Sequence, residues 1–262
     1  MFRIAAALFL FVPCFLFSQG LNPSIEISPN PVPPGTTTIT VTITAPRDAG
    51  ITFSPTNTGL PCDLLLFSGI NGANVLCGAI NICSTSFVPL AACQSISRTL
   101  SVCGTGDFAV RFRYRDALSA TRSEWACFRI QANPATEATL NTVAAPQVGQ
   151  VMALAIAAPA DPLSIYFTGI SFTSNQGVPV NSNLMAHLDN DILFALSTSG
   201  TFPGLFLNFI ATTDANGDSP LIMLPLPQDP SLACLPLKAQ AVVLDLLLNV
   251  RPTNQLNFAV LP

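Results

Sequence analysis

Residues 36–44 read TTTITVTIT, and this segment carries the clearest fold signal in the chain. Every residue in it is β-branched, and from Thr38 onward polar and apolar side chains alternate strictly. That pattern predicts a strand with one face on a core and the other in water. We therefore expect Ile39, Val41 and Ile43 to be buried and the threonines to face outward.

Working outward from this strand, the same alternation recurs along the chain. Residues 107–114 (DFAVRFRY) place Phe108, Val110, Phe112 and Tyr114 on one face. Residues 123–130 (SEWACFRI) are the expected return strand, with Trp125 and its alternates available for the core. Further strands are expected at residues 24–28, 151–157, 163–172, 206–212, 220–226, 238–246 and 257–261. Residues 184–196, interrupted by Asp189-Asn190-Asp191, form either a short helix or a loop followed by a strand.

The proline-rich residues 29–35 (PNPVPPG) separate the first two expected strands. A strand–PxxPG–strand opening is common at the edge of immunoglobulin-like sandwiches, where proline blocks edge pairing. Residues 133–136 (NPAT) have the composition of a linker. We expect an all-β fold of two β-sandwich domains, the first immunoglobulin-like and disulfide-tied over residues 21–134, the second a C-terminal module over residues 135–262.

Composition supports this fold class. Only 9% of the residues are charged and 50% are hydrophobic. Disorder needs high charge and low hydrophobicity, and helical proteins usually fill their exposed faces with Glu, Lys and Arg. Strands with Thr-, Ser- and Asn-rich outer faces explain the composition better.

The first 20 residues have the form of a secretory signal peptide. Arg3 precedes an apolar run over residues 4–17, and Ser18-Gln19-Gly20 supplies small residues for cleavage after Gly20. The run is about 14 residues long, whereas a spanning helix needs about 20. Residues 11–13 (FVP) are a poor lipobox for Cys14, and no later segment has the pattern of a transmembrane helix. We expect a secreted, periplasmic or cell-surface protein.

Six cysteines cluster in the first half: Cys62, Cys77, Cys83, Cys93, Cys103 and Cys127. In an exported chain this indicates three disulfides, and the spacing contains no zinc knuckle. We favour the local pairs Cys62–Cys77, Cys83–Cys93 and Cys103–Cys127 among the 15 connectivities that six cysteines allow. Cys234 is left over, either as a buried free thiol or as a partner for another chain.

The C-terminal part, Pro146 to Pro262, resembles a β-module that recurs in exported proteins of planctomycetes and related bacteria. The resemblance rests on P-x-x-G-Q at residues 146–150, an aspartate turn at 214–217, and LPLPQDPSLACLPLKAQAVVLD at 224–245. A partly degenerate T-N-x-L ending follows at residues 253–256. The module usually has a glycine where this chain has Cys234, which suggests that the leftover thiol is a local substitution. The resemblance implies export and an all-β fold but no defined activity.

Catalytic candidates are scarce. His187 is the only histidine, Asp189 and Asp191 lie too close in sequence to orient it in a triad, and no G-x-S-x-G elbow exists. Residues 214–218 (DANGD) resemble a calcium loop, but the glycine comes too early, and a tight Asn-Gly hairpin turn explains them better. We therefore expect no catalytic residues, metal or cofactor, although an aspartate-based hydrolase site is an alternative.

Arg111, Arg113 and Arg115 are the most distinctive charged feature. They line one face of one expected strand, opposite Phe112 and Tyr114. Six of the nine basic residues after position 20 fall within residues 98–129, against three acids, whereas residues 137–262 hold two basic residues and eight acids. The stripe is either a solvated strand face with cross-strand carboxylate partners or a site for an anionic glycan or polymer.

Together these features predict an exported, non-enzymatic protein with a cell-envelope, matrix or adhesion role. The main alternative is a carbohydrate- or anionic-polymer-binding module that uses the arginine stripe. Expected partners are cell-surface or extracellular polysaccharides or proteins. Nucleic acid is not expected, because the net charge is −4 and the protein is exported.

Overall fold

The computed structural model describes residues 22–47, 50–55, 64–67, 86–102, 104–133, 135–174, 177–181 and 184–262. Outside these residues lie the expected signal peptide, with Cys14, and also Cys62, Cys77, Cys83 and Cys103. Within them the regular secondary structure is almost entirely strand, with one α-helix, α2 (Ile192–Thr198), and one 3-10 turn, η1 (Pro230–Leu232). The all-β fold class is confirmed.

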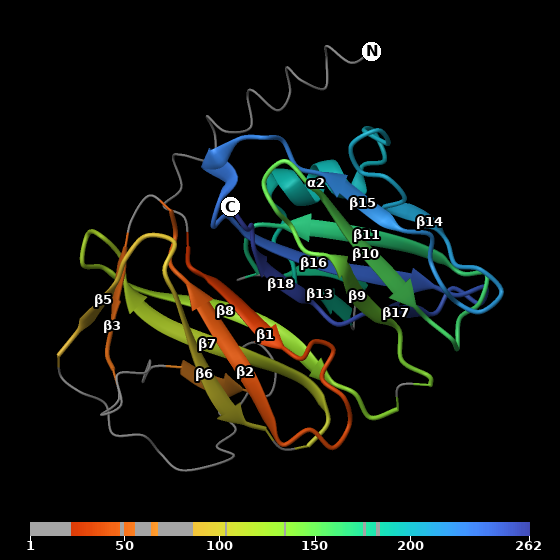
Figure 1. Ribbon diagram of the computed structural model, residues 1–262. Helices are drawn as coiled ribbons and strands as arrows, with labels where there is room; N and C mark the ends of the chain where they lie inside the picture. The colour runs from red at the N-terminus through yellow and green to blue at the C-terminus, as the bar shows by residue number, and fades with distance from the viewer. Residues whose placement is uncertain are drawn as a thin grey trace.

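The N-terminal half packs two antiparallel sheets around one apolar core (Figure 1). One sheet has the order β1 (Ser24–Ser28), β2 (Thr38–Thr44), β6 (Ser95–Ser101). The other has the order β4 (Leu64–Phe67), β7 (Gly106–Arg115), β3 (Ile51–Phe53), β5 (Val88–Leu90), with β8 (Thr121–Ile130) pairing β7. Ile39, Val41 and Ile43 are buried as predicted.

The predicted return strand forms along its whole length, since Asp107 pairs with Arg129 and Arg113 with Ser123. Ala126 and Phe128 face the core. Trp125 instead lies on the opposite face of β8 from these residues, so the expectation that it is available for the core is wrong. Val32, in the proline-rich break, bridges to Ile130, and its N–H and carbonyl bond the main chain of Arg129 and Gln131.

The C-terminal half is a second sandwich with its own core. One sheet has the order β15 (Ile222–Pro225), β10 (Val151–Ala157), β9 (Thr139–Ala144). The other has the order β14 (Ile210–Thr212), β11 (Ile165–Ser171), β16 (Pro236–Leu244), β17 (Val250–Pro252), and β18 (Leu256–Ala259) also pairs β16. A small hairpin joins β12 (Val178–Asn181) to β13 (Leu184–Ala186).

The two alternatives for residues 184–196 both form in part, because β13 is followed by α2. Asp191 ends the interruption as the N-cap of α2, accepting a hydrogen bond from the N–H of Phe194. The helix lies against β11, where Gly169 leaves no room for a Cβ beside the Phe194 ring. A polar interruption therefore marks the start of a helix.

The hairpin expected at residues 214–218 forms only in part, because its flanking segments pair through a single antiparallel bridge between Leu207 and Met223. The turn itself forms: Asp214 accepts hydrogen bonds from the N–H groups of Asn216 and Asp218, and Gly217 has φ +86°. However, β14 before it pairs β11, whereas β15 after it pairs β10. The turn thus connects the two sheets of the sandwich. A calcium ion is not needed to explain Asp214, because the carboxylate already caps its own turn.

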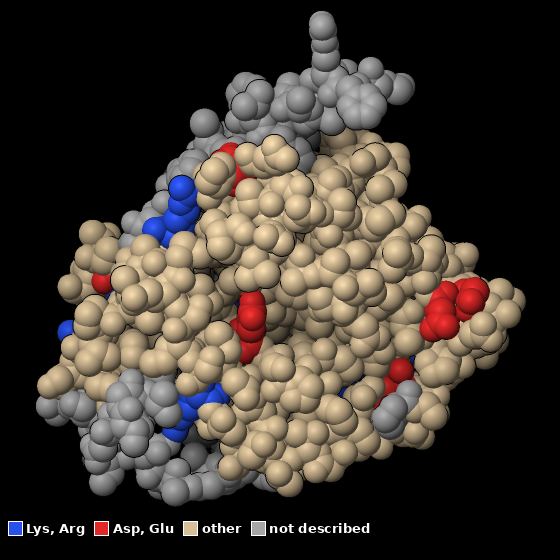
Figure 2. Space-filling model, viewed as in Figure 1, with Lys and Arg blue, Asp and Glu red and all other residues tan. Residues whose placement is uncertain are grey.

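The two halves lie against each other, with β1 and β8 of the first facing β18 and β16 of the second (Figure 1). Their cores fall on either side of residues 131–137; the domain bounds themselves stay a prediction. On the face drawn in Figure 2, charged side chains are few and widely spaced. None of the helices in the described part of the chain is long and apolar enough to cross a membrane.

Candidate functional site

The three stripe arginines lie where their spacing on β7 predicts. Arg113 and Arg115 are exposed and Arg111 is half-buried, while Phe112 and Tyr114 between them face the core. Strand alternation alone produces this arrangement. The stripe therefore crosses the outer face of the second sheet of the N-terminal half.

Aromatic rings lie beside two of these arginines. The Cζ atom of Arg111 is 4.9 Å from the ring centroid of Phe67 on β4 and 5.6 Å from that of Trp125 on β8. The Cζ atom of Arg115 is 3.9 Å from the ring centroid of Phe87, which immediately precedes β5. Such cation–π contacts hold a guanidinium in place beside the ring. We define the arginine–aromatic face as Phe67, Phe87, Arg111, Arg113, Arg115 and Trp125.

The carboxylates of the same segment bind other cations. Asp107 holds Arg129 through two bonds of 2.7 and 3.2 Å. Asp116 binds Arg122 at 3.0 Å, and the hydrogen bond from Arg122 lowers the pKa of Asp116.

Glu124, the third acid of this segment, binds Lys238 on β16 at 2.7 Å. Within the described residues, the three acids of this segment thus bind cations that lie outside the stripe. The stripe itself places three basic side chains on one sheet of a protein that is acidic overall.

The single lysine of the chain is buried between the two halves. Lys238 donates from Nζ to the main-chain carbonyl of Trp125. Gln255 accepts from the N–H of Cys127 at 2.8 Å, and Asn257 donates to the carbonyl of Cys127 at 3.3 Å. An edge strand otherwise leaves such groups unpaired, so these side chains take the place of a neighbouring strand along β8.

Lys238 and Glu124 have the properties of a catalytic pair, but their position argues for a structural role. Burial raises the pKa of Glu124, and Lys238 opposes that shift. Structural ion pairs perturb pKa values as active sites do. Both side chains are only 1% exposed, and Ser174 Oγ lies 3.0 Å from Lys238 Nζ. A pair enclosed in this way cannot reach a substrate.

The ending at residues 253–256 also binds across the boundary. Asn254 accepts from the N–H of Leu140 at 2.9 Å and donates to Asn30 Oδ1 of the first half at 3.1 Å. Glu26 on β1 accepts from the N–H of Ala259 at 2.6 Å, and burial raises the pKa of this carboxyl. The polar residues of the module ending therefore position the two halves.

His187 is placed by main-chain contacts. Its N–H donates to Gln240 Oε1 at 2.7 Å, and its carbonyl accepts from Gln255 Nε2. Burial lowers the pKa of the imidazole. Asp191 caps α2, and Asp189 binds Thr173 Oγ1 and the N–H of Gly177. The two carboxylates adjacent to the histidine thus have structural partners.

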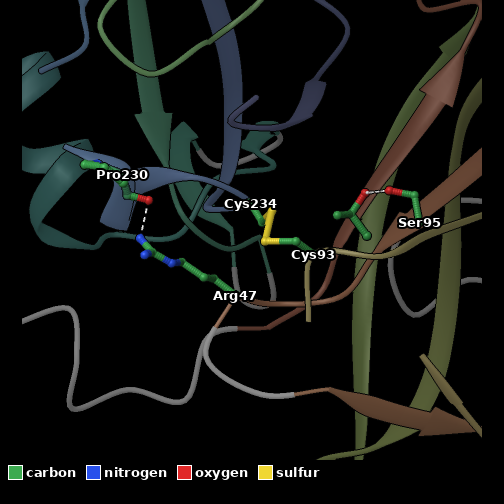
Figure 3. Close-up of a disulfide and its surroundings, with 6 residues drawn as sticks. Arg47, Cys93, Ser95, Pro230 and Cys234 are labelled. Atoms are coloured by element: carbon green, nitrogen blue, oxygen red, sulfur yellow. Dashed lines mark hydrogen bonds between the residues drawn. A yellow bond between two sulfur atoms is a disulfide. The ribbon is translucent and has the colours of Figure 1, made fainter. Parts of the chain in front are cut away.

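A disulfide joins Cys93, in the turn between β5 and β6, to Cys234, just before β16 (Figure 3). Arg47 lies beside it and donates to the carbonyl of Pro230. The expected Cys83–Cys93 pair is therefore wrong, and so is the expectation that Cys234 is a leftover thiol. Cys234 has φ +62°, a backbone conformation that favours glycine.

Cys127, expected to pair with Cys103, is instead a buried free thiol. Burial raises its pKa to about 12, so it is unreactive at neutral pH. Among the described residues, no cluster of three or more His, Cys, Asp or Glu side chains has a metal-binding arrangement.

Phe67 and Phe87 were not singled out from the sequence. They belong to the cysteine-rich middle of the first half, where no period-2 pattern marks which side chains share a face. Their neighbours in space, Arg111 and Arg115, lie 44 and 28 positions away in the chain. Only the strand pairing of β4 and β7 places Phe67 near Arg111.

Comparison with known proteins identifies no family. No family model matches the chain, and no curated protein matches it. Among solved structures, it is similar to the adhesin InvE of Yersinia pseudotuberculosis, with 16% identity over 90% of this chain and 58% of that one, at a TM-score of 0.24. A tetra-tandem repeat of the extending region of a large adhesion protein shares 14% identity over 90% of this chain and 49% of that one, at a TM-score of 0.25. Murine CEACAM1b shares 10% identity over 91% of this chain and 100% of that one, at a TM-score of 0.24.

Proposed function

We propose that this chain is an exported, non-enzymatic binding protein of the cell exterior, with an envelope, matrix or adhesion role. Its arginine–aromatic face would bind an anionic polymer such as a sulfated or carboxylated polysaccharide. One observation carries the proposal: three arginines lie in a row on an outer sheet face, and two of them lie against aromatic rings.

The spacing of the arginines suits a polymer with repeated charge. Alternate residues of a strand are about 6.6 Å apart, so Arg111 to Arg115 span about 13 Å. A guanidinium binds carboxylate or sulfate groups through two parallel hydrogen bonds, which a lysine cannot do. The ring beside Arg115 is 42% exposed and offers an apolar surface to a sugar ring. A chain of acidic sugars therefore fits this face better than a small ion.

Export is supported by the apolar N-terminus and by the disulfide, because disulfides persist in oxidising compartments. The non-enzymatic part rests on the partners described above for His187, Asp191 and Glu124, all of which have structural contacts. We further propose that residues 146–262 are the C-terminal module of exported planctomycete-type proteins. Supporting this, the P-x-x-G-Q and L-P-L-P-Q segments bond each other, with Gly149 N–H donating to Pro227 and Leu226 N–H to Gln150.

The test is retention on beads that carry dextran sulfate, with plain dextran beads as the matrix control. The matched variants are Arg111→Gln/Arg113→Gln/Arg115→Gln and Arg47→Gln/Arg122→Gln/Arg251→Gln, which lose the same charge from different places. We expect the wild type and the second variant to be retained and the first to pass through. Equal retention of both variants would overturn the proposal, because binding would then not require the arginine–aromatic face. Equal loss would also overturn it, because binding would then depend on net charge alone.

A further inference from the structure

Three consecutive leucines project from the second sandwich. Leu246, Leu247 and Leu248 connect β16 to β17 and are 80, 82 and 74% exposed. A single exposed leucine is ordinary on a protein surface, as Leu118 is in the β7–β8 turn at 87%. Three in succession on one tip form a patch that water solvates poorly. We call residues 245–249 the leucine turn.

Hydrogen bonds within the leucine turn fix its shape. Asp245 Oδ1 accepts from the N–H groups of Leu247 and Asn249, both at 2.8 Å, and the Asp245 carbonyl accepts from Leu248 at 2.9 Å. Asp245 Oδ2 accepts from Asn249 Nδ2 at 2.8 Å. The N–H groups of Leu247, Leu248 and Asn249 are therefore satisfied inside the turn. The one charged group of the turn, the Asp245 carboxylate, is held at the base by three hydrogen bonds, with the leucines beyond it.

An apolar surface continues behind the turn. Leu244 and Val250 pair with each other directly below it, and Ile165 pairs with Leu244 on the other side. The next row across the same sheet contains Phe167 and Val242. Ile165 and Phe167 are among the exposed large hydrophobic residues of the protein. The leucine turn is thus the tip of a wider apolar surface.

We propose that the leucine turn inserts into a lipid surface with neutral headgroups. Consecutive side chains on a tight turn diverge, so a flat protein surface cannot bury all three leucines, whereas fluid acyl chains can surround them. The N–H groups of Leu247 and Leu248 are already satisfied within the turn, which lowers the cost of moving this backbone out of water. A shallow apolar insertion of this kind gives weak, reversible binding.

The charges around the turn select the kind of lipid. Leu163 on the neighbouring loop is exposed, and its N–H bonds the carbonyl of Asp214. Asp161 and Asp218 belong to the same group of loops, and Arg251 binds Asp161 at 3.3 Å. Acids outnumber basic residues at this end, so anionic headgroups would repel it. Zwitterionic lipid is the matching partner.

This inference goes beyond the proposed polymer binding and does not depend on it. The arginine–aromatic face lies in the first half of the chain and the leucine turn in the second. Each site can therefore be removed without touching the other. A protein with both would contact a lipid surface at one end and an anionic polymer at the other.

The test is co-sedimentation of the oxidised, purified protein with phosphatidylcholine vesicles. The variant Leu246→Ser/Leu247→Ser/Leu248→Asn removes the apolar tip, and asparagine tolerates the φ of +63° at position 248. Leu118→Ser is the matched control, because it removes an equally exposed leucine elsewhere. We expect a wild-type partition constant of at most about 10⁴ M⁻¹, as for one acyl chain. The triple variant should lose at least tenfold, and Leu118→Ser should match the wild type.

Three further readouts make the outcome decisive. Replacing part of the phosphatidylcholine with phosphatidylserine should weaken binding, and the triple arginine variant should bind vesicles normally even if polymer binding is lost. In the variant Leu247→Trp, brominated lipid should quench the introduced indole but not Trp125. Unchanged vesicle binding by the triple leucine variant overturns the inference. The inference is also overturned if the wild type does not bind vesicles but self-associates through the turn in sedimentation velocity. The partner of the turn is then a second copy of the chain.

Discussion

Lys238 Nζ lies 2.7 Å from Glu124 Oε1, and both side chains are 1% exposed although they come from different sandwiches. The two residues are 114 positions apart. The lysine also reaches the carbonyl of Trp125 and the hydroxyl of Ser174. One buried cation thus organises the contact between the halves, and its removal tests how far they depend on each other.

We expect Lys238→Met to lower the free energy of unfolding by about 3–5 kcal/mol, because it leaves the Glu124 carboxylate buried without a counter-charge. The double variant Lys238→Met/Glu124→Met should be more stable than Lys238→Met alone, since both desolvated charges disappear together. Urea unfolding followed by the fluorescence of Trp125, the only tryptophan, measures both. Strictly additive effects of Lys238→Met and Glu124→Met would contradict the coupling.

The disulfide gives a second test of the contact between the halves. Cys93 and Cys234 are 141 residues apart, and closing so long a loop restricts the unfolded chain strongly. We expect Cys93→Ser/Cys234→Ser to lose about 4–5 kcal/mol by the chain-entropy estimate. Cys127→Ala is the control, because it removes a buried cysteine that forms no disulfide. A double variant with the same urea midpoint as the wild type would mean that the cross-link does not stabilise the fold.

These long-range contacts mark the limit of what the sequence predicts. The strands over residues 38–44, 106–115 and 121–130 follow from local alternation, and their bounds differ from the expected ones by two residues at most. By contrast, the segments on either side of Asp214 were expected to pair along their length, whereas they share one bridge, Leu207–Met223, and otherwise pair with different strands. An Asx turn with glycine suits a hairpin and a sheet-to-sheet connection equally well, so the partner strand was not predictable.

In the candidate site, too, some features follow from local alternation and others depend on long-range contacts. The outward row of Arg111, Arg113 and Arg115 follows from strand period, whereas the rings beside it depend on which strands become neighbours. The Cys93–Cys234 disulfide was not predictable, because sequence spacing carries no information on distance between the halves. The resemblance marked Cys234 only as a substitution for glycine, and its φ of +62° is known only from the fold.

His187 predicts a specific pH dependence of stability. Burial lowers its folded-state pKa below the ordinary 6.5. Between the folded-state and unfolded-state pKa values of His187, the unfolded chain binds more protons than the folded one. The contribution of His187 to the free energy of unfolding is therefore complete above pH 6.5 and is lost as the pH falls through the folded-state pKa. We expect the unfolding free energy of the wild type to fall more between pH 7.5 and about pH 5 than that of His187→Gln.

The comparison isolates the histidine, because it is the only one in the chain and other titrating groups are the same in both proteins. Glu26 and Glu124 have raised pKa values, which act in the opposite direction as the pH falls toward 4.5, and they cancel in the difference. Urea unfolding at a series of pH values gives the two curves. A difference between them that does not change with pH would contradict the burial of the imidazole.

Arg113 separates specific recognition from simple charge on the arginine–aromatic face. It is exposed, and its strand partner is Ser123, so substitutions there should change stability by less than about 0.5 kcal/mol. Arg113→Lys keeps the positive charge but loses the planar fork that binds an acidic group through two hydrogen bonds. We expect the affinity of Arg113→Lys for dextran sulfate to lie between that of the wild type and that of Arg113→Gln, as measured by the salt concentration needed for elution.

Phe87→Leu should weaken binding of dextran sulfate about two- to fivefold by releasing Arg115 from its ring. If Arg113→Lys and Phe87→Leu both elute with the wild type while Arg113→Gln does not, the face acts only as a positive surface, and any polyanion of equal charge density should then bind equally well.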